Sequence, residues 1–456
     1  MPERPRFGTD GVRGEANHEL TPDVALALAR ATAALLVPPQ DDPGVRRRVL
    51  IGRDTRQSGP MLEAALVAGY AASGVDVELL GEVPTPAVAW VSAVEGVAAA
   101  MISASHNPFA DNGIKFFAPG GHKLADDVED RIETLFHALL EGASPDSDAV
   151  TGAAIGRVRA SDRALGWADA VVASAEGRRF DGLTVVLDCA HGAASAWAPD
   201  IFERLGASVE VIGARPDGVN INEGFGSTHP ERLAESVVAA NAALGLAFDG
   251  DADRLIAIDD SGRVVDGDHV LAILARDWKS TGRLVDDTVV VTVMSNLGFR
   301  LAMADADITV VETGIGDRYV LEALNGGRFS LGGEQSGHVI CRDLATTGDG
   351  VLAGVQLVDS VLRSGRSLAD LSDAAMTTLP QVLKNVRLAA RDPQIAARLA
   401  PAISEVEAEM GGQGRVLVRP SGTEPLVRIM VEHPIAATAE AMCNRLVSTA
   451  EHLLGH

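Results

Sequence analysis

Short apolar runs alternate with longer Ala- and Leu-rich segments through most of the chain. The runs at 49–51, 75–80 and 98–102 predict buried strands, and the segments at 21–36 and 60–72 predict helices between them. The first helix begins with Thr-Pro-Asp, which supplies an N-cap, a proline at the first helical position and an early acidic residue. This βαβ alternation predicts a largely parallel sheet covered by helices on both faces.

The same order of elements restarts twice, at 183–187 and at 288–293, and then gives way to a different tail. The tail pattern is strand 384–388, helix 393–410, strands 416–418 and 426–432, and helix 438–454. We therefore expect an α/β protein with three doubly wound α/β domains of similar topology and a C-terminal α+β lid domain around a central cleft. The predicted domains are 1–158, 159–262, 263–375 and 376–456.

The charge balance of the 456-residue chain is strongly acidic, with 39 Lys and Arg against 63 Asp and Glu and a formal net charge of −24. Nucleic acids and anionic membranes are polyanions, so this balance argues against both as partners. The same field repels phosphorylated small molecules from a distance. Any phosphate site must therefore be locally basic.

Cysteine usage and the first residues bear on the compartment. Cys189, Cys341 and Cys443 are far apart and odd in number, which predicts buried thiols in a reducing environment. Residues 1–6 are charged and contain proline, unlike a signal peptide, and no apolar run reaches the length of a membrane span. We therefore expect a cytoplasmic protein.

A serine loop follows the predicted strand at 98–102. Residues 103–108 read Ser-Ala-Ser-His-Asn-Pro, and the Asn-Pro step predicts a turn. Ser105 would thus stand at the carboxyl end of a parallel strand, where open α/β sheets bind ligands. It is a candidate phosphate carrier or, alternatively, the cap of a following helix. Lys115 could serve the same site as a proton carrier or phosphate partner, and His106 could equally orient the loop.

An acidic loop follows the predicted strand at 244–248. Asp249, Asp251 and Asp253 occupy alternate positions, so their carboxylates can converge on one hard cation such as Mg²⁺. An EF-hand also begins in this way, but here its sixth position is Arg254 and its twelfth is Asp260. A solvated acidic turn is the other alternative. Mutual repulsion of three close carboxylates favours the metal site.

Three further loops offer polar groups for a ligand. Residues 332–338, Gly-Gly-Glu-Gln-Ser-Gly-His, could bind sugar hydroxyls or form an ordinary capped turn. Residues 419–425, Arg-Pro-Ser-Gly-Thr-Glu-Pro, with Arg428 beyond, supply the parts of a phosphate cradle or of a surface turn with a salt bridge to Glu424. The Gly-rich segment 7–14 places Arg13 where it could neutralise a phosphate.

These five motifs, in this order, resemble those of the α-D-phosphohexomutase superfamily, and the resemblance spans Gly8 to Arg428. It implies that Ser105 is a phosphoserine that binds one Mg²⁺ per chain together with the aspartates. The implied metal ligands are Ser105, Asp249, Asp251 and Asp253, the implied catalytic residues are Ser105, Lys115, His338 and Arg13, and Arg254 is implied in charge neutralisation. The implied substrate-binding residues are Glu334, Ser336, Arg419, Ser421, Gly422, Thr423 and Arg428.

Within the superfamily, the Ile-Ser-Ala-Ser motif, Gln335 and Ala252 are similar to those of bacterial phosphoglucosamine mutases. This implies interconversion of glucosamine 6-phosphate and glucosamine 1-phosphate through a sugar 1,6-bisphosphate, supplying UDP-N-acetylglucosamine for cell-wall synthesis. Glucosamine or glucose 1,6-bisphosphate is the implied activator, and a homodimer is one expected assembly.

Two alternatives stay open at this point. A phosphomannomutase or phosphoglucomutase would keep the chemistry and change the sugar. A non-catalytic sugar-phosphate-binding protein would be expected to have lost Ser105 or one of the aspartates, and all four are present.

Overall fold

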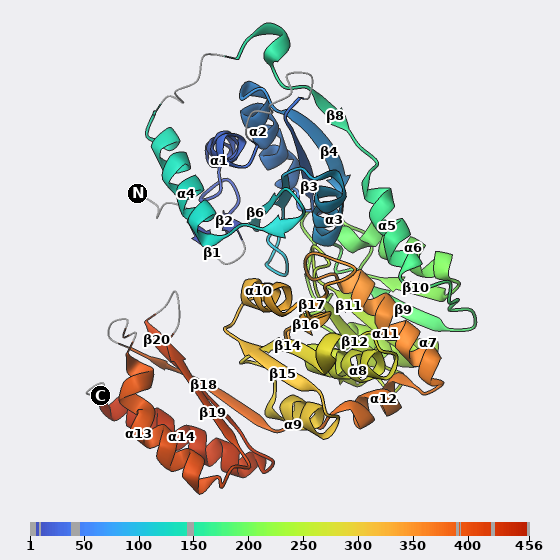
Figure 1. Ribbon diagram of the computed structural model, residues 1–456, viewed down its shortest axis with the longest axis vertical. Helices are drawn as coiled ribbons and strands as arrows, with labels where there is room; N and C mark the ends of the chain where they lie inside the picture. The colour runs from blue at the N-terminus through green and yellow to red at the C-terminus, as the bar shows by residue number, and fades with distance from the viewer. Residues whose placement is uncertain are drawn as a thin grey trace. The chain divides into compact units, whose positions relative to one another are not determined.

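A computed structural model describes residues 6–8, 11–37, 46–143, 150–388, 392, 394–420 and 425–453. The chain forms two compact units. The first comprises Met1–Met294 and Ile308–Asp373, and the second comprises Ser295–Asp307 and Ala374–His456 (Figure 1). Within the described ranges, every helix is too short or too polar to cross a membrane.

The N-terminal region of the first unit is built on a mixed sheet with the order β1-β2-β6-β5-β3-β4-β8, and β7 pairs with β6. Its strands are β1 Phe7–Gly8, β2 Gly11–Glu15, β3 Arg48–Arg53, β4 Asp76–Glu82, β5 Ala99–Ile102, β6 Asp111–Ala118, β7 His122–Lys123 and β8 Val158–Ala160. Its helices are α1 Pro22–Leu35, α2 Gly59–Ala72, α3 Thr85–Glu95 and α4 Asp126–Leu140. Strands β5, β3, β4 and β8 are parallel, whereas β1, β2, β6 and β7 pair antiparallel, so the expected largely parallel sheet is only half parallel.

Two further sheets complete the first unit. The first, ordered β10-β9-β11-β12-β13, contains β9 Thr184–Asp188, β10 Ser208–Ile212, β11 Leu244–Phe248, β12 Leu255–Asp259 and β13 Val264–Val265. The other, ordered β15-β14-β16-β17, contains β14 Thr288–Thr292, β15 Thr309–Thr313, β16 Leu331–Gly333 and β17 Val339–Cys341. The accompanying helices are α5 Ala164–Ala173, α6 Ala198–Leu205, α7 Glu231–Ala240, α8 Gly267–Ser280, α10 Asp317–Gly327 and α11 Gly350–Ser364. Helix α12, Leu368–Ala375, follows α11 in the chain.

The three sheets share one topology, as the recurring sequence pattern predicts. The strand sets β4-β3-β5-β6, β10-β9-β11-β12 and β15-β14-β16-β17 have the same order, with three parallel strands and an antiparallel fourth. The fourth strand follows the third through a short loop each time. These three loops, after β5, β11 and β16, carry the serine, aspartate and Gly-Gly-Glu motifs.

Small residues allow the helices of the N-terminal region to pack closely. Helices α1, α2 and α4 share one core on one side of the sheet (Figure 1). A Cβ at Gly69 of α2 would lie 2.6 Å from the Ala29 Cβ of α1, which shows how near the two helices come. Alanine and glycine thus replace aromatic bulk in a chain with only 4% aromatic residues.

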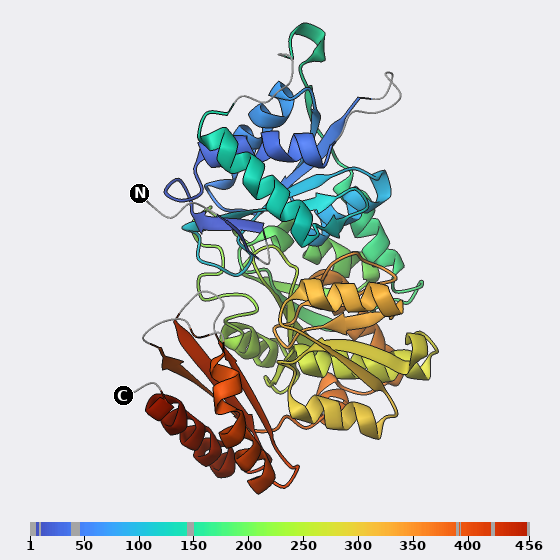
Figure 2. The same ribbon diagram turned by 60° about the vertical axis from the view of Figure 1, so that its left-hand side comes forward.

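The second unit is an antiparallel sheet, β18-β20-β19, with α13 and α14 along one face (Figures 1 and 2). Its strands are β18 Gln381–Arg387, β19 Arg415–Pro420 and β20 Leu426–Glu432, and its helices are α9 Leu297–Asp305, α13 Ile395–Glu409 and α14 Ala436–Leu453. Helix α9 belongs here because buried Glu432 accepts the Leu297 backbone N–H (3.1 Å) and pairs with Arg415 (2.8 Å).

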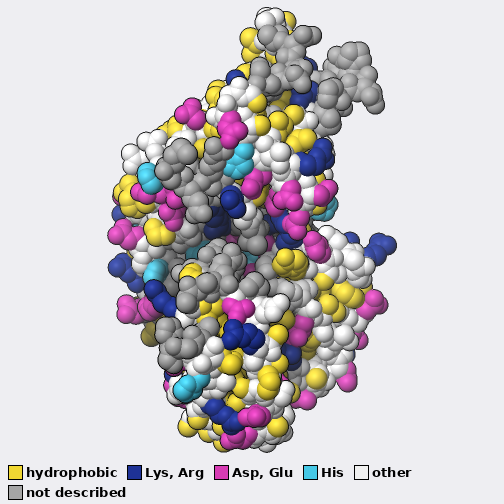
Figure 3. All heavy atoms as spheres, turned by 90° about the vertical axis from the view of Figure 1, so that its left-hand side faces the viewer, with side chains coloured by type: hydrophobic (Ala, Val, Ile, Leu, Met, Phe, Trp, Pro, Cys, Tyr) yellow, Lys and Arg dark blue, Asp and Glu magenta, His cyan; other side chains and the backbone are white. Residues whose placement is uncertain are grey.

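Charges of opposite sign are interspersed on one face of the protein. On the face shown in Figure 3, Asp and Glu side chains lie among Lys and Arg side chains. This face therefore shows no patch of a single charge sign among the described residues, although the whole chain carries a net charge of −24.

Candidate functional site

Ser105 is held in a buried, left-handed turn between β5 and β6. Its φ is +53° and its exposed fraction is 1%. The Ser105 Oγ donates a hydrogen bond to Asp249 Oδ2 at 2.5 Å and lies 3.4 Å from His106 Nδ1. The segment after the loop is strand β6, so the alternative of a helix cap is wrong. The serine and aspartate motifs, 144 residues apart in sequence, meet directly.

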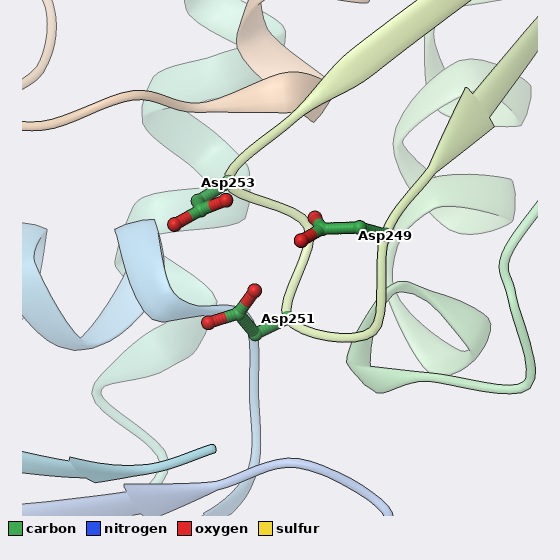
Figure 4. Close-up of side chains that lie close together, drawn as sticks. All are labelled: Asp249, Asp251 and Asp253. Atoms are coloured by element: carbon green, nitrogen blue, oxygen red, sulfur yellow. The ribbon is translucent and has the colours of Figure 1, made fainter. Parts of the chain in front are cut away.

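The three aspartates form one buried cluster in the loop between β11 and β12, where their carboxylates turn toward one another (Figure 4). One oxygen of each lies within 4.8 Å of the others. Ala252, at φ +57°, provides the turn that brings alternate residues of the loop to one side. Asp249, Asp251 and Asp253 are at most 5% exposed, which excludes the solvated acidic turn.

Lys115 and Thr85 hold one of these carboxylates. The Lys115 Nζ lies 2.8 Å from Asp251 Oδ2 and 3.5 Å from Asp253 Oδ2. Thr85, the first residue of α3, donates its hydroxyl to the same Asp251 oxygen at 2.6 Å. Strand β6 therefore brings Lys115 to the aspartates.

The donor set of this cluster fits a hard divalent cation. Asp251 Oδ1 and Asp253 Oδ1 are buried and accept no hydrogen bond from the described residues. Asp253 Oδ1 has longer contacts, to His338 Nδ1 at 3.7 Å and Arg254 Nε at 3.8 Å. A buried carboxylate oxygen without a partner is costly unless something positive faces it. Burial, and next the charges of Asp253 and Asp251, raise the pKa of Asp249 well above its usual range. An Mg²⁺ ion with oxygen ligands would offset both effects.

His338, at the end of the loop between β16 and β17, faces the cluster from the third sheet. Its Nδ1 lies 3.7 Å from Asp253 Oδ1 and its Nε2 lies 3.3 Å from Asp317 Oδ2. Burial alone would lower the pKa of His338, but the polar contact with Asp253 and the charges of Asp253 and Asp317 raise it to about 8. The Gly348 N–H also approaches Nε2 at 3.2 Å, which fits only the neutral ring. Protonation of Nε2 would therefore replace the contact with the Gly348 N–H by one with the Asp317 carboxylate. Each protonation state thus has a partner, so His338 can gain or lose a proton here.

The polar residues that precede His338 in this loop are partly or fully exposed. The Glu334 Oε1 accepts the Gly316 N–H at 3.3 Å, and Ser336 is exposed. A hydrogen bond from Leu255 N to Gly337 O, at 2.9 Å, fixes the loop beside the strand that follows the aspartates. Glu334 and Ser336 thus lie on the loop that ends in His338.

Two arginines add positive charge near the serine. Arg13 of β2 pairs in register with Gly113 of β6, and Arg254 directly follows the aspartates. Burial, and next the charges of Arg254 and Arg13, lower the pKa of His106 to about 4. Both guanidinium groups therefore act on the serine loop, where a phosphate on Ser105 would need them.

A separate arginine pair lies in the second unit. Arg419 of β19 and Arg428 of β20 stand directly opposite each other in the antiparallel register. Burial, and next the charge of Arg428, lower the pKa of Arg419. Like charges placed opposite each other destabilise a sheet, so this pair is suited to an anion. The expected partners Ser421, Gly422 and Thr423, and the alternative partner Glu424, lie outside the described residues.

Sequence reasoning missed several residues that support the site. Arg56 and Asn222 donate hydrogen bonds to the backbone of the serine loop, and Asp317 faces His338. Arg56 carried a usable signal, since Asp-Thr-Arg follows β3 at the edge of the sheet where ligands bind. Asn222 gave no such signal. It lies between β10 and α7, and nothing in the sequence around it indicates which residues it contacts.

Four family profiles match successive parts of the chain. They are phosphoglucomutase/phosphomannomutase α/β/α domain I over residues 4–142, domain II over 166–262, domain III over 266–379 and the C-terminal domain over 383–448. Their order agrees with the three repeated sheets followed by an antiparallel one.

Curated relatives match over almost their whole length. A phosphoglucosamine mutase of Mycolicibacterium gilvum is 53% identical over 446 residues, covering 97% of this chain and 98% of the relative. One of Leifsonia xyli is 52% identical over 459 residues, covering 98% and 99%.

Two solved structures have the same fold at low identity. A Burkholderia thailandensis phosphoglucomutase/phosphomannomutase family protein has a TM-score of 0.79 and 23% identity, covering 98% of each chain. Aspergillus fumigatus N-acetylphosphoglucosamine mutase, in complex with GlcNAc-6P and magnesium, has a TM-score of 0.68 and 17% identity, covering 100% of this chain and 96% of that one.

Proposed function

The chain belongs to the phosphoglucomutase/phosphomannomutase family of the α-D-phosphohexomutase superfamily, and from this premise we propose that it interconverts glucosamine 6-phosphate and glucosamine 1-phosphate. Its full-length relatives bear the name phosphoglucosamine mutase. The observation that carries the proposal is the 2.5 Å contact between Ser105 Oγ and Asp249, beside two further buried aspartates.

Ser105 is proposed to carry the phosphoryl group. The bond between phosphorus and Ser105 Oγ breaks as a bond forms from phosphorus to the oxygen of the free sugar hydroxyl. The sugar hydroxyl loses its proton and Ser105 Oγ gains one, which regenerates the serine hydroxyl. The product is a sugar 1,6-bisphosphate. In the second half of the cycle, Ser105 takes the other phosphoryl group and leaves the isomeric monophosphate. The chain's contribution is position and charge neutralisation, which dominate phosphoryl transfer.

Mg²⁺ is proposed to be held by the phosphoserine with Asp249, Asp251 and Asp253, one ion per chain. Bound there, it would neutralise charge on the phosphoryl group. The buried carboxylate oxygens that accept no hydrogen bond support this assignment, and an Aspergillus fumigatus relative of the same fold was solved with magnesium.

The remaining charges are assigned around this centre. Arg13 and Arg254 are proposed to neutralise the phosphoserine, which itself carries about −1.5 to −2 charges. Lys115 and His338 are the candidate proton carriers, because both contact the aspartate cluster, which in turn accepts the Ser105 hydroxyl.

The substrate is proposed to be held at two ends. Glu334 and Ser336 bind sugar hydroxyls, and the Arg419–Arg428 pair binds the phosphate that does not react. Ser421, Gly422 and Thr423 are proposed to complete the phosphate loop. Glucosamine or glucose 1,6-bisphosphate would restore phosphoserine lost to hydrolysis. A homodimer, a cytoplasmic location and supply of UDP-N-acetylglucosamine precursors are part of the same proposal.

Turnover on three sugars tests the assignment. The purified protein, with Mg²⁺ and catalytic bisphosphate, is compared on glucosamine, glucose and mannose 6-phosphates. We expect the highest kcat/KM with the glucosamine compound. Preference for glucose or mannose would favour the phosphoglucomutase or phosphomannomutase alternative, and no turnover on any of the three would reject the mutase.

A further inference from the structure

We propose that Asn222 and Arg56 are positioning residues that clamp the backbone of the serine loop and thereby fix Ser105 Oγ against the aspartate cluster. The inference rests on the proposed phosphoryl transfer from Ser105. Both side chains act on carbonyl groups of the loop rather than on the reacting atoms.

The serine loop needs such a clamp because Ser105 has an unfavourable backbone. At φ +53° its Cβ crowds the backbone, a conformation that only glycine adopts freely. Glycine would relieve the strain but would also remove the Oγ. A residue held in this region persists only when its surroundings impose it.

Asn222 and Arg56 donate hydrogen bonds to the same two carbonyl groups. The Asn222 amide donates to Ser105 O at 2.9 Å and to Asn107 O at 3.0 Å. Arg56 donates to the same two oxygens, at 3.1 and 2.6 Å. Four hydrogen bonds therefore fix the carbonyl on each side of the turn, and two of them come from a charged donor, which makes them stronger.

Both donors are themselves immobilised. Arg56 is fully buried and ion-paired with Asp54, which is also fully buried. Asn222 is 7% exposed, and its own N–H donates to Ala190 O at 2.9 Å. The Ala190 N–H in turn donates to the buried carboxylate of Asp188 at 2.9 Å. Neither clamp residue can shift without breaking contacts of its own.

The Asn222 side of the clamp also touches the metal loop. A Cβ on Gly250, between two of the aspartates, would lie 2.6 Å from Ser105 O and 2.9 Å from Asn222 Nδ2. The metal loop, the serine carbonyl and the amide are thus packed without spare room. Asn222 comes from the loops around the second sheet, which also carries the aspartates, whereas Arg56 follows β3 of the serine's own sheet. The clamp therefore fixes the position of Ser105, in one domain, relative to the metal ligands in the next domain.

Two substitutions remove the Asn222 donor in different ways. Asn222→Asp keeps the shape, but a carboxylate cannot donate to the two carbonyl oxygens. Asn222→Gly keeps the left-handed backbone, which is φ +60° here, and removes the amide. The matched control is Asn241→Asp, the same exchange at an exposed left-handed Asn (φ +47°) that ends α7.

The test measures kcat and KM for glucosamine 6-phosphate, the phosphorylated fraction of Ser105 by intact mass, and the thermal midpoint. We expect kcat to fall about 100-fold in Asn222→Asp and about tenfold in Asn222→Gly, because small displacements of reacting groups cost rates of this order. KM should stay within about threefold, as for a group that contacts no part of the substrate. Asn241→Asp should match the parent protein.

Equal kcat in parent and both Asn222 variants, at equal phosphorylated fraction, would overturn the clamp. So would a higher KM at unchanged kcat, which would make Asn222 a substrate contact. If Asn222→Asp does not fold, Asn222→Gly alone decides. A parent protein inactive on glucosamine phosphates would reject the proposed function instead. In that case the clamp would be tested by the rate at which glucose 1,6-bisphosphate phosphorylates Ser105. We expect this rate to fall by the same factors, about 100-fold in Asn222→Asp and about tenfold in Asn222→Gly.

Discussion

At the scale of single residues, the aspartate cluster contains buried carboxylate oxygens that accept no hydrogen bond from the described part of the protein. Replacing Asp249, Asp251 or Asp253 by Asn should weaken Mg²⁺ affinity, because each change removes one negative ligand from a buried site. Mg²⁺ titration of activity is the measurement. Asp260→Asn, the same exchange at an exposed position beyond β12, is the matched control and should leave the titration unchanged. Full activity of EDTA-treated protein would contradict the metal site.

Gly250 gives a purely steric prediction. A Cβ at this position would lie 2.6 Å from the backbone oxygen of Ser105, so Gly250→Ala must push the serine and metal loops apart. We expect kcat to fall about tenfold or more. The control is Gly326→Ala in α10, where a Cβ meets nothing within 4 Å. That exchange should keep activity and raise the free energy of unfolding by up to about 1 kcal/mol, from helix propensity. Equal kinetics for the two variants would contradict the close approach.

The residues that sequence reasoning found and those it missed differ in how they act. Ser105 and the aspartates each follow an apolar strand in a short motif, so each motif is predicted to lie at the carboxyl edge of its own sheet. That the two motifs meet was implied only by the family resemblance. Asn222 acts through a loop whose path is set by tertiary packing, including a hydrogen bond from its backbone to Ala190. No local pattern encodes such a contact.

At the scale of elements, the paired arginines of β19 and β20 predict opposite effects on binding and stability. Arg419→Gln should raise KM about 30-fold or more, since loss of a charged partner costs about 2–5 kcal/mol. It should also raise the thermal midpoint in phosphate-free buffer, because it removes a like charge opposite Arg428. Arg445→Gln on α14, where Arg445 pairs with Glu405 and Glu409, is the control and should leave KM unchanged. An unchanged KM in Arg419→Gln would remove this pair from the substrate site.

Strands whose sequences are mostly apolar could be predicted. A strand with a polar sequence that is buried only by its neighbours in the sheet could not. Residues 244–248 and 426–432 form strands with the expected bounds, because their side chains are almost all apolar. Strand β6 reads Asp-Asn-Gly-Ile-Lys at its start, which resembles a loop. It is buried because β2 and β5 flank it on either side, and this pairing also makes half of the first sheet antiparallel.

At the scale of the whole molecule, a buried carboxylate links two helices from different sheet regions. Its raised pKa predicts that the stability of the protein depends on pH. Asp349 caps α11 and accepts the Trp167 Nε1–H of α5 at 2.8 Å. Burial raises the pKa of Asp349 to about 6, although its hydrogen bonds act in the other direction. The folded state then holds a proton that the unfolded state has lost. Stability from this group is complete below the unfolded pKa and is lost as pH rises through 6.

The corresponding experiment compares thermal midpoints at pH 5 and pH 7.5. The parent protein should lose about 1.4 kcal/mol from Asp349 between pH 5 and pH 7.5, and Asp349→Asn should lose less. Asp343→Asn, at a carboxylate whose side chain is 55% exposed, should behave like the parent protein. A parent protein and Asp349→Asn with identical pH dependence would contradict the raised pKa.

The order of domains was predictable from the recurring elements, and the course of the chain between the two units was not. Helix α9 belongs with the C-terminal sheet although β14 and β15, on either side of it in sequence, belong to the third sheet. The cause is a set of polar contacts around Glu432, which no apolar pattern reveals. The boundaries at 158, 262 and 375, and the central cleft, stay predictions.

The central claim is that Ser105 passes its own phosphoryl group to the sugar. Protein phosphorylated at Ser105 with a labelled phosphoryl group is mixed in a single turnover with unlabelled glucosamine 6-phosphate and Mg²⁺, and the label is followed in protein and sugar. The account predicts that label leaves Ser105 and appears in the sugar 1,6-bisphosphate and then in the monophosphates, and that Ser105→Ala never takes up label or turns over. Product formed while the label stays on Ser105, or full turnover by Ser105→Ala, would contradict the account.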